Sequence, residues 1–356
     1  MKKLILIFCM LLSVSIFSSC NNAKPEAQPP SNENGETVTV ATPAALTLAD
    51  YFVYQANAKY TYEGTGNEYA SYTVFVDYLA GNRVQIRSNN GGTEMVKVLE
   101  NKNGQLTVLL AHEESYYREN FLQKNSDKTE ILLQEPLIKG TAWTLADQRK
   151  RYISNLNVPV TTPLANYQAL EVTTENEYDK VLDYYVPHVG LVKTIFMSNG
   201  VEITSSLSKI EMNTPLRQQV QFFYPNVEED KIYFQTKELI FNTNDLTKLA
   251  FEKTFKDLSS EKFGRVLGAN VKINSLYLNQ DGKIYVDFSK ELISEMNAGS
   301  GYEGMIIQSI TNTLGIYYGK DKVYITIEEK PYASGHIELR KGEFFTVDLA
   351  NCVELK

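Results

Sequence analysis

The sequence predicts an α+β protein in which a mainly antiparallel β domain, a half-barrel or a sandwich, precedes a smaller α/β sandwich. Between residues 46 and 212, tyrosine-rich runs of strand type alternate with Gly and Asn turns, and helical periodicity is scarce. Between residues 217 and 349, strand patterns are mixed with apolar positions spaced as on helices. Pro215 and a charged opening separate the two patterns, so we predict two domains with a boundary there.

The first nineteen residues have the pattern of an export signal. Two lysines precede an apolar run from Leu4 to Phe17, and Ser18 and Ser19 stand directly before Cys20. A run of about 14 residues is short for a membrane-spanning helix, which needs about 20. An ordinary cleaved signal peptide is the alternative. The segment resembles the lipobox of bacterial lipoproteins, in which the cysteine is acylated, although Phe17 replaces the commoner leucine.

That resemblance implies that residues 1–19 are a lipoprotein signal peptide and that Cys20 is the lipid-attachment site, carrying palmitate or a similar chain. The protein is then expected to be anchored in the cell membrane, facing the extracytoplasmic side. Residues 20–45 are rich in Pro, Asn and Glu and lack aromatic residues, which predicts a disordered tether. The net charge is −8, which argues against nucleic acid as a partner.

Two stretches characterise the β domain. Leu133 to Trp143 and Tyr184 to Lys193 resemble stretches of β-rich domains in bacterial lipoproteins, and the resemblance carries no settled activity. The favoured interpretation is structural: each stretch forms a turn that leads into a strand, with Trp143 buried. The alternative is that Trp143 and the tyrosines at 184 and 185 line a concave pocket for a glycan or an amphiphile, with His188 orienting the ligand.

In the second domain, apolar alternation predicts strands near Val220–Tyr224, Ile232–Ile240 and Val271–Ile273. Asn279–Gly282 has turn chemistry and leads to a strand at Ile284–Phe288. Helices are expected over residues 246–258, after a Ser289 cap, and from a Ser300 cap with Glu303 as a capping box until Gly315. A closing strand follows at Val323–Ile327, and residues 350–356 are predicted to be a C-terminal tail.

The order of these elements, with the stretches Val220–Pro225, Asp281–Leu292 and Gly299–Glu303, resembles the GerMN domain of sporulation and germination proteins. The match continues through Ser309–Leu314, Val323–Ile325 and Ser334–His336. The resemblance implies a non-enzymatic, extracytoplasmic module whose α/β sandwich is similar to ring-building domains of membrane secretion complexes. The germination protein is similar to two such domains in tandem. A single copy here weakens the inference of a role in sporulation.

Other patterns indicate no specific chemistry. Gly299 to Gly304 has the glycine spacing of a dinucleotide-binding motif, but it follows a helix rather than a strand, so we interpret it as a helix cap. If Gly301 needs a positive φ, Gly301→Ala is expected to lower the free energy of unfolding by on the order of 1 kcal/mol. Cys352 is expected to be a packed or idle thiol. We therefore predict no catalytic residue, metal or cofactor. A hydrolase remains an alternative, because folding can bring together carboxylates that are distant in the sequence.

Three hypotheses follow from these observations. The favoured one is an assembly or scaffolding lipoprotein of the cell envelope, whose C-terminal domain binds envelope proteins or further copies of itself through sheet edges and the loop from Glu328 to Gly335. The second is a lipoprotein that binds an amphiphile or cell-wall glycan in the β domain. The third is an enzyme whose site the sequence does not reveal.

Overall fold

The computed structural model describes residues 46–126 and 128–355. The predicted signal peptide, Cys20 and the tether lie outside the described residues. The described residues fall within a single compact unit, Ala45–Lys356. The proposed boundary between residues 212 and 217 remains a prediction.

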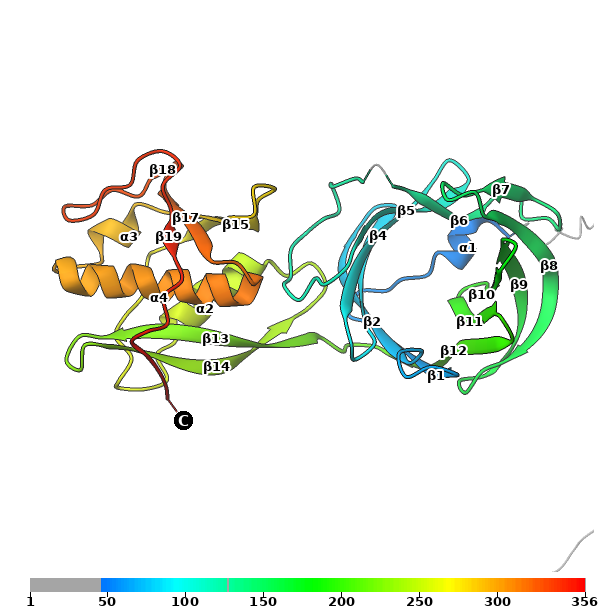
Figure 1. Cartoon of the computed structure of the whole chain (residues 1–356), viewed down its shortest axis with the longest axis horizontal. Coiled ribbons are helices and arrows are strands. Elements are labelled where there is room, and N and C mark those ends of the chain that lie inside the picture. Colours follow the sequence, from blue (N-terminus) through cyan, green and yellow to red (C-terminus); the bar gives the residue numbers. More distant parts are fainter. Residues whose placement is uncertain (1–45, 127, 356) are drawn as a thin grey trace, which may run out of the picture. The chain divides into compact units, whose positions relative to one another are not determined.

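An antiparallel sheet of twelve strands forms the N-terminal part of this unit (Figure 1). Its strands run in the spatial order β6-β5-β4-β3-β2-β1-β12-β11-β10-β9-β8-β7, so two meanders meet at β1 and β12. The sheet curves, with the short helix α1 on its concave side, as expected for a half-barrel. The bounds are α1 (Leu48–Tyr51), β1 (Lys59–Thr65), β2 (Tyr72–Ala80), β3 (Arg83–Asn89), β4 (Glu94–Lys102), β5 (Gln105–His112), β6 (Glu130–Gln134), β7 (Ala142–Thr144), β8 (Lys150–Thr161), β9 (Asn166–Glu175), β10 (Asp179–Val186), β11 (Gly190–Ser198) and β12 (Val201–Glu211).

Turn chemistry fixes most of the hairpins of this sheet. Gly81, with a φ of 58°, connects β2 to β3, and Asn90 to Thr93 connect β3 to β4. The sequence Gly64-Thr65-Gly66 has the composition of a turn and predicts one, but this prediction is wrong, because Gly64 and Thr65 belong to β1 and pair with β12. A Cβ on Gly64 would lie 2.2 Å from the backbone carbon of Ala70, so this glycine permits a close approach of two chain segments.

The C-terminal part is an α/β sandwich in which α4 packs between two sheets (Figure 1). One sheet has the order β13-β14-β20; the other has the order β15-β16-β17-β18, with β19 also paired to β17. The bounds are β13 (Leu216–Asn226), β14 (Lys231–Phe241), α2 (Thr247–Lys256), β15 (Ile273–Leu278), β16 (Ile284–Phe288), α3 (Glu291–Ser294), α4 (Ser300–Tyr318), β17 (Lys322–Ile327), β18 (Lys330–Pro331), β19 (Phe345–Thr346) and β20 (Cys352–Glu354). The segment predicted as a tail therefore supplies β20, which pairs in parallel with β14.

Helix α4 differs from its predicted form at both ends. It begins at Ser300 with Gly299 as its N-cap, and the Glu303 side chain accepts hydrogen bonds from the hydroxyls of Tyr332 (2.8 Å) and Ser334 instead of forming a capping box. The helix continues past Gly315 to Tyr318 and ends at Gly319, which has a φ of 62°. Gly315 serves packing, because a Cβ there would lie 2.2 Å from Cγ2 of Val347.

Two hydrophobic cores stabilise the unit. The first lies on the concave side of the curved sheet and includes Leu48, Leu106, Val172 and Val192. The second fills the α/β sandwich around Phe222, Ile310 and Ile325, and it also contains Tyr78, Val96 and Val98 from the large sheet. Because this second core includes residues from both parts, they are joined by apolar packing as well as by the chain.

Candidate functional site

A cavity of about 450 Å³ lies among residues of the curved sheet and α1. This size falls in the range of roughly 300–1,000 Å³ that is common for ligand pockets. Strands β3 to β6 supply an aliphatic wall of Ile86, Leu99, Leu106 and Leu132. The other walls are rich in tyrosine: Tyr51, Tyr54, Tyr60, Tyr62, Tyr69, Tyr72 and Tyr185 line the cavity.

The tyrosines hold one another in place. The rings of Tyr62 and Tyr72 are stacked with centroids 4.5 Å apart, and those of Tyr54 and Tyr60 meet edge to face at 6.1 Å. Tyr62 donates its hydroxyl to the carbonyl of Leu191 at 2.8 Å. In the described part of the chain, no hydrogen bond involves the hydroxyl of Tyr54 or Tyr72. Burial raises the pKa of both hydroxyls, so they remain neutral donors at physiological pH.

A polar group lies within the cavity wall. The hydroxyl of Thr194 donates to Oδ1 of Asp183 at 2.7 Å, and no donor among the described residues reaches Oδ2. Burial raises the pKa of Asp183, while Thr194 and Arg151 lower it by smaller amounts. Each side-chain nitrogen of Arg151 has one partner: the three nitrogens contact Thr174 at 2.6 Å, the carbonyl of Ile131 at 2.7 Å and Glu130 at 2.7 Å, which uses three of the five N–H donors.

Only part of the predicted pocket is present. Tyr185 lines the cavity, whereas Tyr184, Trp143 and His188 do not. The Trp143 indole donates to the carbonyl of Ile131 at 3.0 Å and packs against the first core, but Trp143 is half-buried rather than buried as the structural interpretation expects. The expectation that His188 orients a ligand is wrong: its side chain is 74% exposed in the turn after β10, and its Nδ1 lies 3.8 Å from Asp50.

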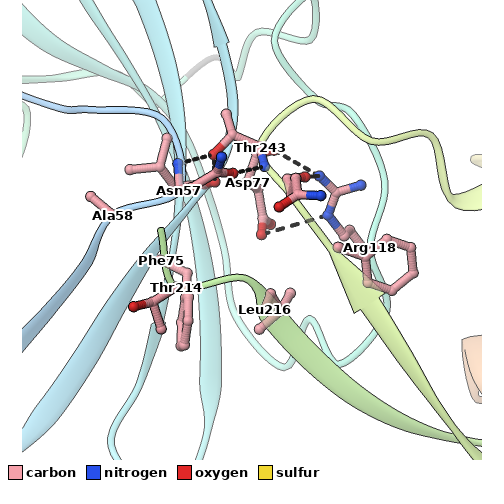
Figure 2. Close-up of a pocket in the computed structure, with 11 residues that line it drawn as sticks. Asn57, Ala58, Phe75, Asp77, Arg118, Thr214, Leu216 and Thr243 are labelled. Atoms are coloured by element: carbon pink, nitrogen blue, oxygen red, sulfur yellow. Dashed lines mark hydrogen bonds and ion pairs between the residues drawn. The ribbon is translucent and has the colours of Figure 1, made fainter. Parts of the chain in front are cut away.

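Arg118 joins the curved sheet to the α/β sandwich (Figure 2). It comes from the long loop between β5 and β6 and is 1% exposed. Its guanidinium donates to the carbonyls of Asp77 (2.7 Å), Asn242 (3.2 Å) and Asp245, and it stacks 4.2 Å from the Tyr78 ring. These partners belong to β2 and to the connection between β14 and α2.

Asp77 completes this junction. Its carboxylate is 3.1 Å from Arg87 and 3.9 Å from Arg118, and both arginines are buried. Thr243 adds a second link by donating to the carbonyl of Val76 at 2.7 Å and accepting from the backbone of Asn57 at 2.8 Å (Figure 2). The adjoining space is only about 10 Å³, which is about one water molecule. The junction therefore serves structure rather than ligand binding.

A ladder of tyrosines crosses the outer face of the second sheet of the sandwich. Tyr277, Tyr285 and Tyr324 occupy facing positions on β15, β16 and β17, with ring centroids 5.6 and 5.0 Å apart. Their neighbours Ile284, Val286, Val323 and Ile325 point to the opposite face, into the core. Tyr277 is 38% exposed, so the ladder presents aromatic surface to solvent.

The loop after β17 is more ordered than the sequence indicates. Glu328 and Glu329 have φ values of 47° and 65°, and the backbone N–H of Glu329 donates to Asp287 at 2.7 Å. Tyr332 is fully buried against Glu303. The predicted docking loop is therefore exposed at Glu328–Lys330 and again at Ala333 and Gly335, and it is anchored between them by Tyr332.

Sequence patterns missed the residues that matter most at these sites. Asp77 stands in the apolar run of β2, and Asp183 stands between apolar residues of β10. A single acidic residue inside an otherwise apolar strand is the sequence pattern that could have identified both residues. The tyrosines at 60, 62 and 72 were identified as strand residues, but only the curvature of the sheet brings them opposite Leu106 and Leu132. Arg118 lies in a loop without a recognisable pattern.

The described residues contain no group of three or more His, Cys, Asp or Glu side chains placed to hold a metal ion. None of the helices in residues 46–126 or 128–355 is long and apolar enough to cross a membrane. Cys352 is half-buried, its sulfur lies 3.4 Å from the side-chain amide of Asn312, and burial raises the pKa of the thiol.

The fold thus defines a curved β-sheet joined to an α/β sandwich that presents an aromatic face. Residues 220–333 match the family described as Germane: Sporulation and spore germination. The chain therefore carries a Germane domain, which confirms the GerMN resemblance. No curated protein matches the sequence.

Solved structures show limited similarity. The tandem GerMN domains of the sporulation protein GerM from Bacillus subtilis match with 20% identity over 39% of this chain and 45% of that chain, less than half of its length, with a TM-score of 0.25. The first GerMN domain of the same protein matches with 23% identity over 38% of this chain and 95% of that chain, with a TM-score of 0.25. A candidate lipoprotein from Parabacteroides distasonis matches with 13% identity over 45% of this chain and 98% of that chain, with a TM-score of 0.29. TM-scores this low carry no argument about function.

Proposed function

We propose that this chain is a membrane-anchored protein of the cell envelope, on the extracytoplasmic side, whose Germane domain docks envelope proteins or further copies of the chain. The observation that carries this proposal is the tyrosine ladder of β15, β16 and β17. Aromatic residues are enriched in protein interfaces, where they supply large contact areas at a low entropic cost. The description of the family suggests a process of sporulation or germination.

The edge of the same sheet adds to the proposed surface. β15 pairs with β16 on one side only, and an unpaired strand edge offers backbone groups to a partner. Two backbone groups of this edge are already engaged, the N–H of Leu278 with Glu119 at 3.0 Å and the carbonyl of Asn274 with Lys248 at 2.5 Å. Because Tyr277 lies on the same strand, an incoming segment would meet the ladder together with the remaining edge groups. Close spacing of lipid anchors in a membrane would raise the effective concentration of such contacts.

Crosslinking in intact cells tests the docking surface. Replacing Tyr277, Tyr285 and Tyr324 by Ser is expected to abolish the capture of partner proteins, because the aromatic contact area is lost. Tyr178→Ser is the matched control, since Tyr178 is 70% exposed in a turn of the other sheet. Unchanged capture by the triple variant, with an unchanged melting temperature, would assign docking to another surface. The reversal Glu328→Lys with Glu329→Lys is expected to weaken capture less.

The anchor requires a separate test. Cys20→Ala is expected to remove the acyl mass from the N-terminal peptide and to release the protein from membranes after an alkaline wash, because one cysteine provides the attachment site. If the wild-type peptide carries no acyl group and the variant still partitions wholly with membranes, the lipoprotein hypothesis fails.

A second function, binding of an amphiphile or a glycan, is favoured by the cavity of about 450 Å³ in the curved sheet. Docking and ligand binding use different parts of the chain, so they are compatible. The variants above change no residue of the cavity.

A further inference from the structure

We propose that the cavity of the curved sheet binds a single amphiphile, with an elongated apolar body against β3 to β6 and a hydrogen-bond-donating end, an amine or a hydroxyl, at Asp183. The proposal deepens the second function above and rests on it. Its starting point is the distribution of polar and apolar groups over the cavity wall.

The apolar wall favours a hydrocarbon body over a sugar. Ile86, Leu99, Leu106 and Leu132 come from four neighbouring strands and offer no hydrogen-bonding side chain. The same strands also place Ser88, Lys97 and Glu130 in the cavity lining, so the apolar wall is the part formed by the four aliphatic residues. A glycan carries hydroxyls on every face, and those facing this wall would lose their water without finding a partner. A methylene chain, by contrast, becomes more tightly bound with each CH₂ that it buries against this wall.

The polar end favours a donor over an acceptor. Arg151 also lines the cavity, but three of its five N–H donors are already used by Thr174, Ile131 and Glu130, so it has at most two donors left for an incoming carboxylate. Asp183 satisfies one carboxylate oxygen through Thr194 and leaves Oδ2 without a donor among the described residues. Asp183 is half-buried, so a ligand that covers it would take water away from Oδ2, and a donor on that ligand removes the cost of this desolvation.

The surrounding rings suit the same kind of head group. Tyr54, Tyr72 and Tyr185 line the cavity together with Asp183. Burial raises the pKa of the Tyr72 and Tyr185 hydroxyls, and the negative charge of Asp183 raises it further. Aromatic faces attract an ammonium group, and free tyrosine hydroxyls accept from a hydroxyl or an amine. Lys97 and Arg151 also line the cavity, so an anionic head group is the competing occupant.

Displacement of a fluorescent apolar probe, N-phenyl-1-naphthylamine, tests this proposal. The segment from residue 46 onward is used, because it contains both hydrophobic cores and lacks the expected lipid-attachment site. The competitors share a ten-carbon chain: decylamine, 1-decanol, methyl decyl ether and decanoate. We expect the amine and the alcohol to bind about tenfold more tightly than the ether, which accepts but cannot donate, and more tightly than decanoate.

Two variants, each with a matched control, localise the effect. Asp183→Asn is expected to reduce the preference for decylamine over the ether to about twofold or less. Asp179→Asn, on the same strand but outside the cavity, is the matched control and should keep the preference. Leu132→Trp is expected to fill the cavity and abolish probe binding, whereas Val201→Trp, at an exposed position, should not.

The outcomes separate the two levels of the proposal. Equal displacement by the ether and the alcohol, tightest binding of decanoate, or a preference that survives Asp183→Asn would overturn the assignment of the head group and leave amphiphile binding intact. Absence of probe binding to the folded protein, or saturable binding of a soluble oligosaccharide instead, would overturn the amphiphile itself. If Leu132→Trp fails to fold, Asp183→Asn still decides the question of the head group.

Discussion

Asp183 illustrates how one side chain can favour a ligand at the expense of stability. Its carboxyl has a raised pKa because burial disfavours the charged form. The native state therefore holds this proton more tightly than the unfolded chain, whose aspartates titrate near pH 3.9. The associated stability is complete below that pH and is lost as the pH rises through the native pKa.

The first prediction at this scale concerns Asp183→Asn. The amide removes the buried charge and can still accept from Thr194, so the free energy of unfolding should increase at pH 7. The gain should vanish below about pH 3.9, where Asp183 is neutral in both states. Urea unfolding at pH 3.5 and pH 7 measures the difference. An equal gain at both values, or a loss at pH 7, would contradict it.

Arg118 and Asp77 carry the second prediction. Arg118→Ala would leave the carboxylate of Asp77 with one buried cation fewer, and it would remove the donors that hold the carbonyls of Asn242 and Asp245. Breaking a buried ion pair from one side typically costs about 3–5 kcal/mol. A loss of that order in the free energy of unfolding is expected.

The comparison variant for this loss is Arg217→Ala. Arg217 pairs with Glu238 at 2.5 Å, but both side chains are substantially exposed. Exposed pairs contribute about 0–1 kcal/mol, so this variant should change stability little. Similar losses in the two variants would show that burial does not set the strength of the Arg118 junction.

At the scale of elements, α4 shows what sequence periodicity captured and what it missed. Ile306, Ile310 and Leu314 are buried as their spacing predicts. The expected end at Gly315 was wrong, because glycine both terminates helices and permits close packing, and only the nearby Val347 distinguishes the two roles. Glu303 was misassigned for a similar reason: its partners Tyr332 and Ser334 are distant in sequence.

The third prediction follows from the glycines of α4. Gly301 lies in the first turn with a helical environment, and a Cβ there would meet nothing within 4 Å. Gly301→Ala should therefore raise the free energy of unfolding by about 0.5–1 kcal/mol, the reverse of the loss expected if φ were positive. Gly315→Ala should lower it by about 1–3 kcal/mol through overpacking against Val347. Thermal or denaturant unfolding measures both, and a loss in the Gly301 variant would refute the assignment.

Strands were easier to predict than the sites they build. Period-two alternation and turn residues identified the hairpin of β15 and β16 and most strands of the curved sheet. Curvature depends on the register shifts within several strand pairs, such as the one between Val76 and Tyr78. These shifts decide which side chains face the cavity, and no single strand pattern contains them.

At the scale of the whole molecule, the shared core limits how function can be dissected. Val96 and Val98 of the curved sheet pack into the core of the sandwich with Phe222 and Ile310. Deleting residues 218–356 would expose apolar surface on the remaining sheet, so a loss of partner capture after deletion would not locate the partner site. Surface substitutions at the tyrosine ladder leave this core intact, and they give the sharper test.

The order of strands in the curved sheet has a consequence for folding kinetics. Each meander, β1 to β6 and β7 to β12, can grow by pairing neighbouring strands, whereas the seam between β1 and β12 joins Lys59 to Glu211. Pairing across such a long loop is slow, because its closure entropy precedes the stabilising contacts. In pulsed hydrogen exchange during refolding, amides of the seam should therefore gain protection after those of the β4–β5 hairpin. Tyr62 and Tyr72 come from one meander and Asp183 and Tyr185 from the other, so the cavity comes into existence only when the seam closes.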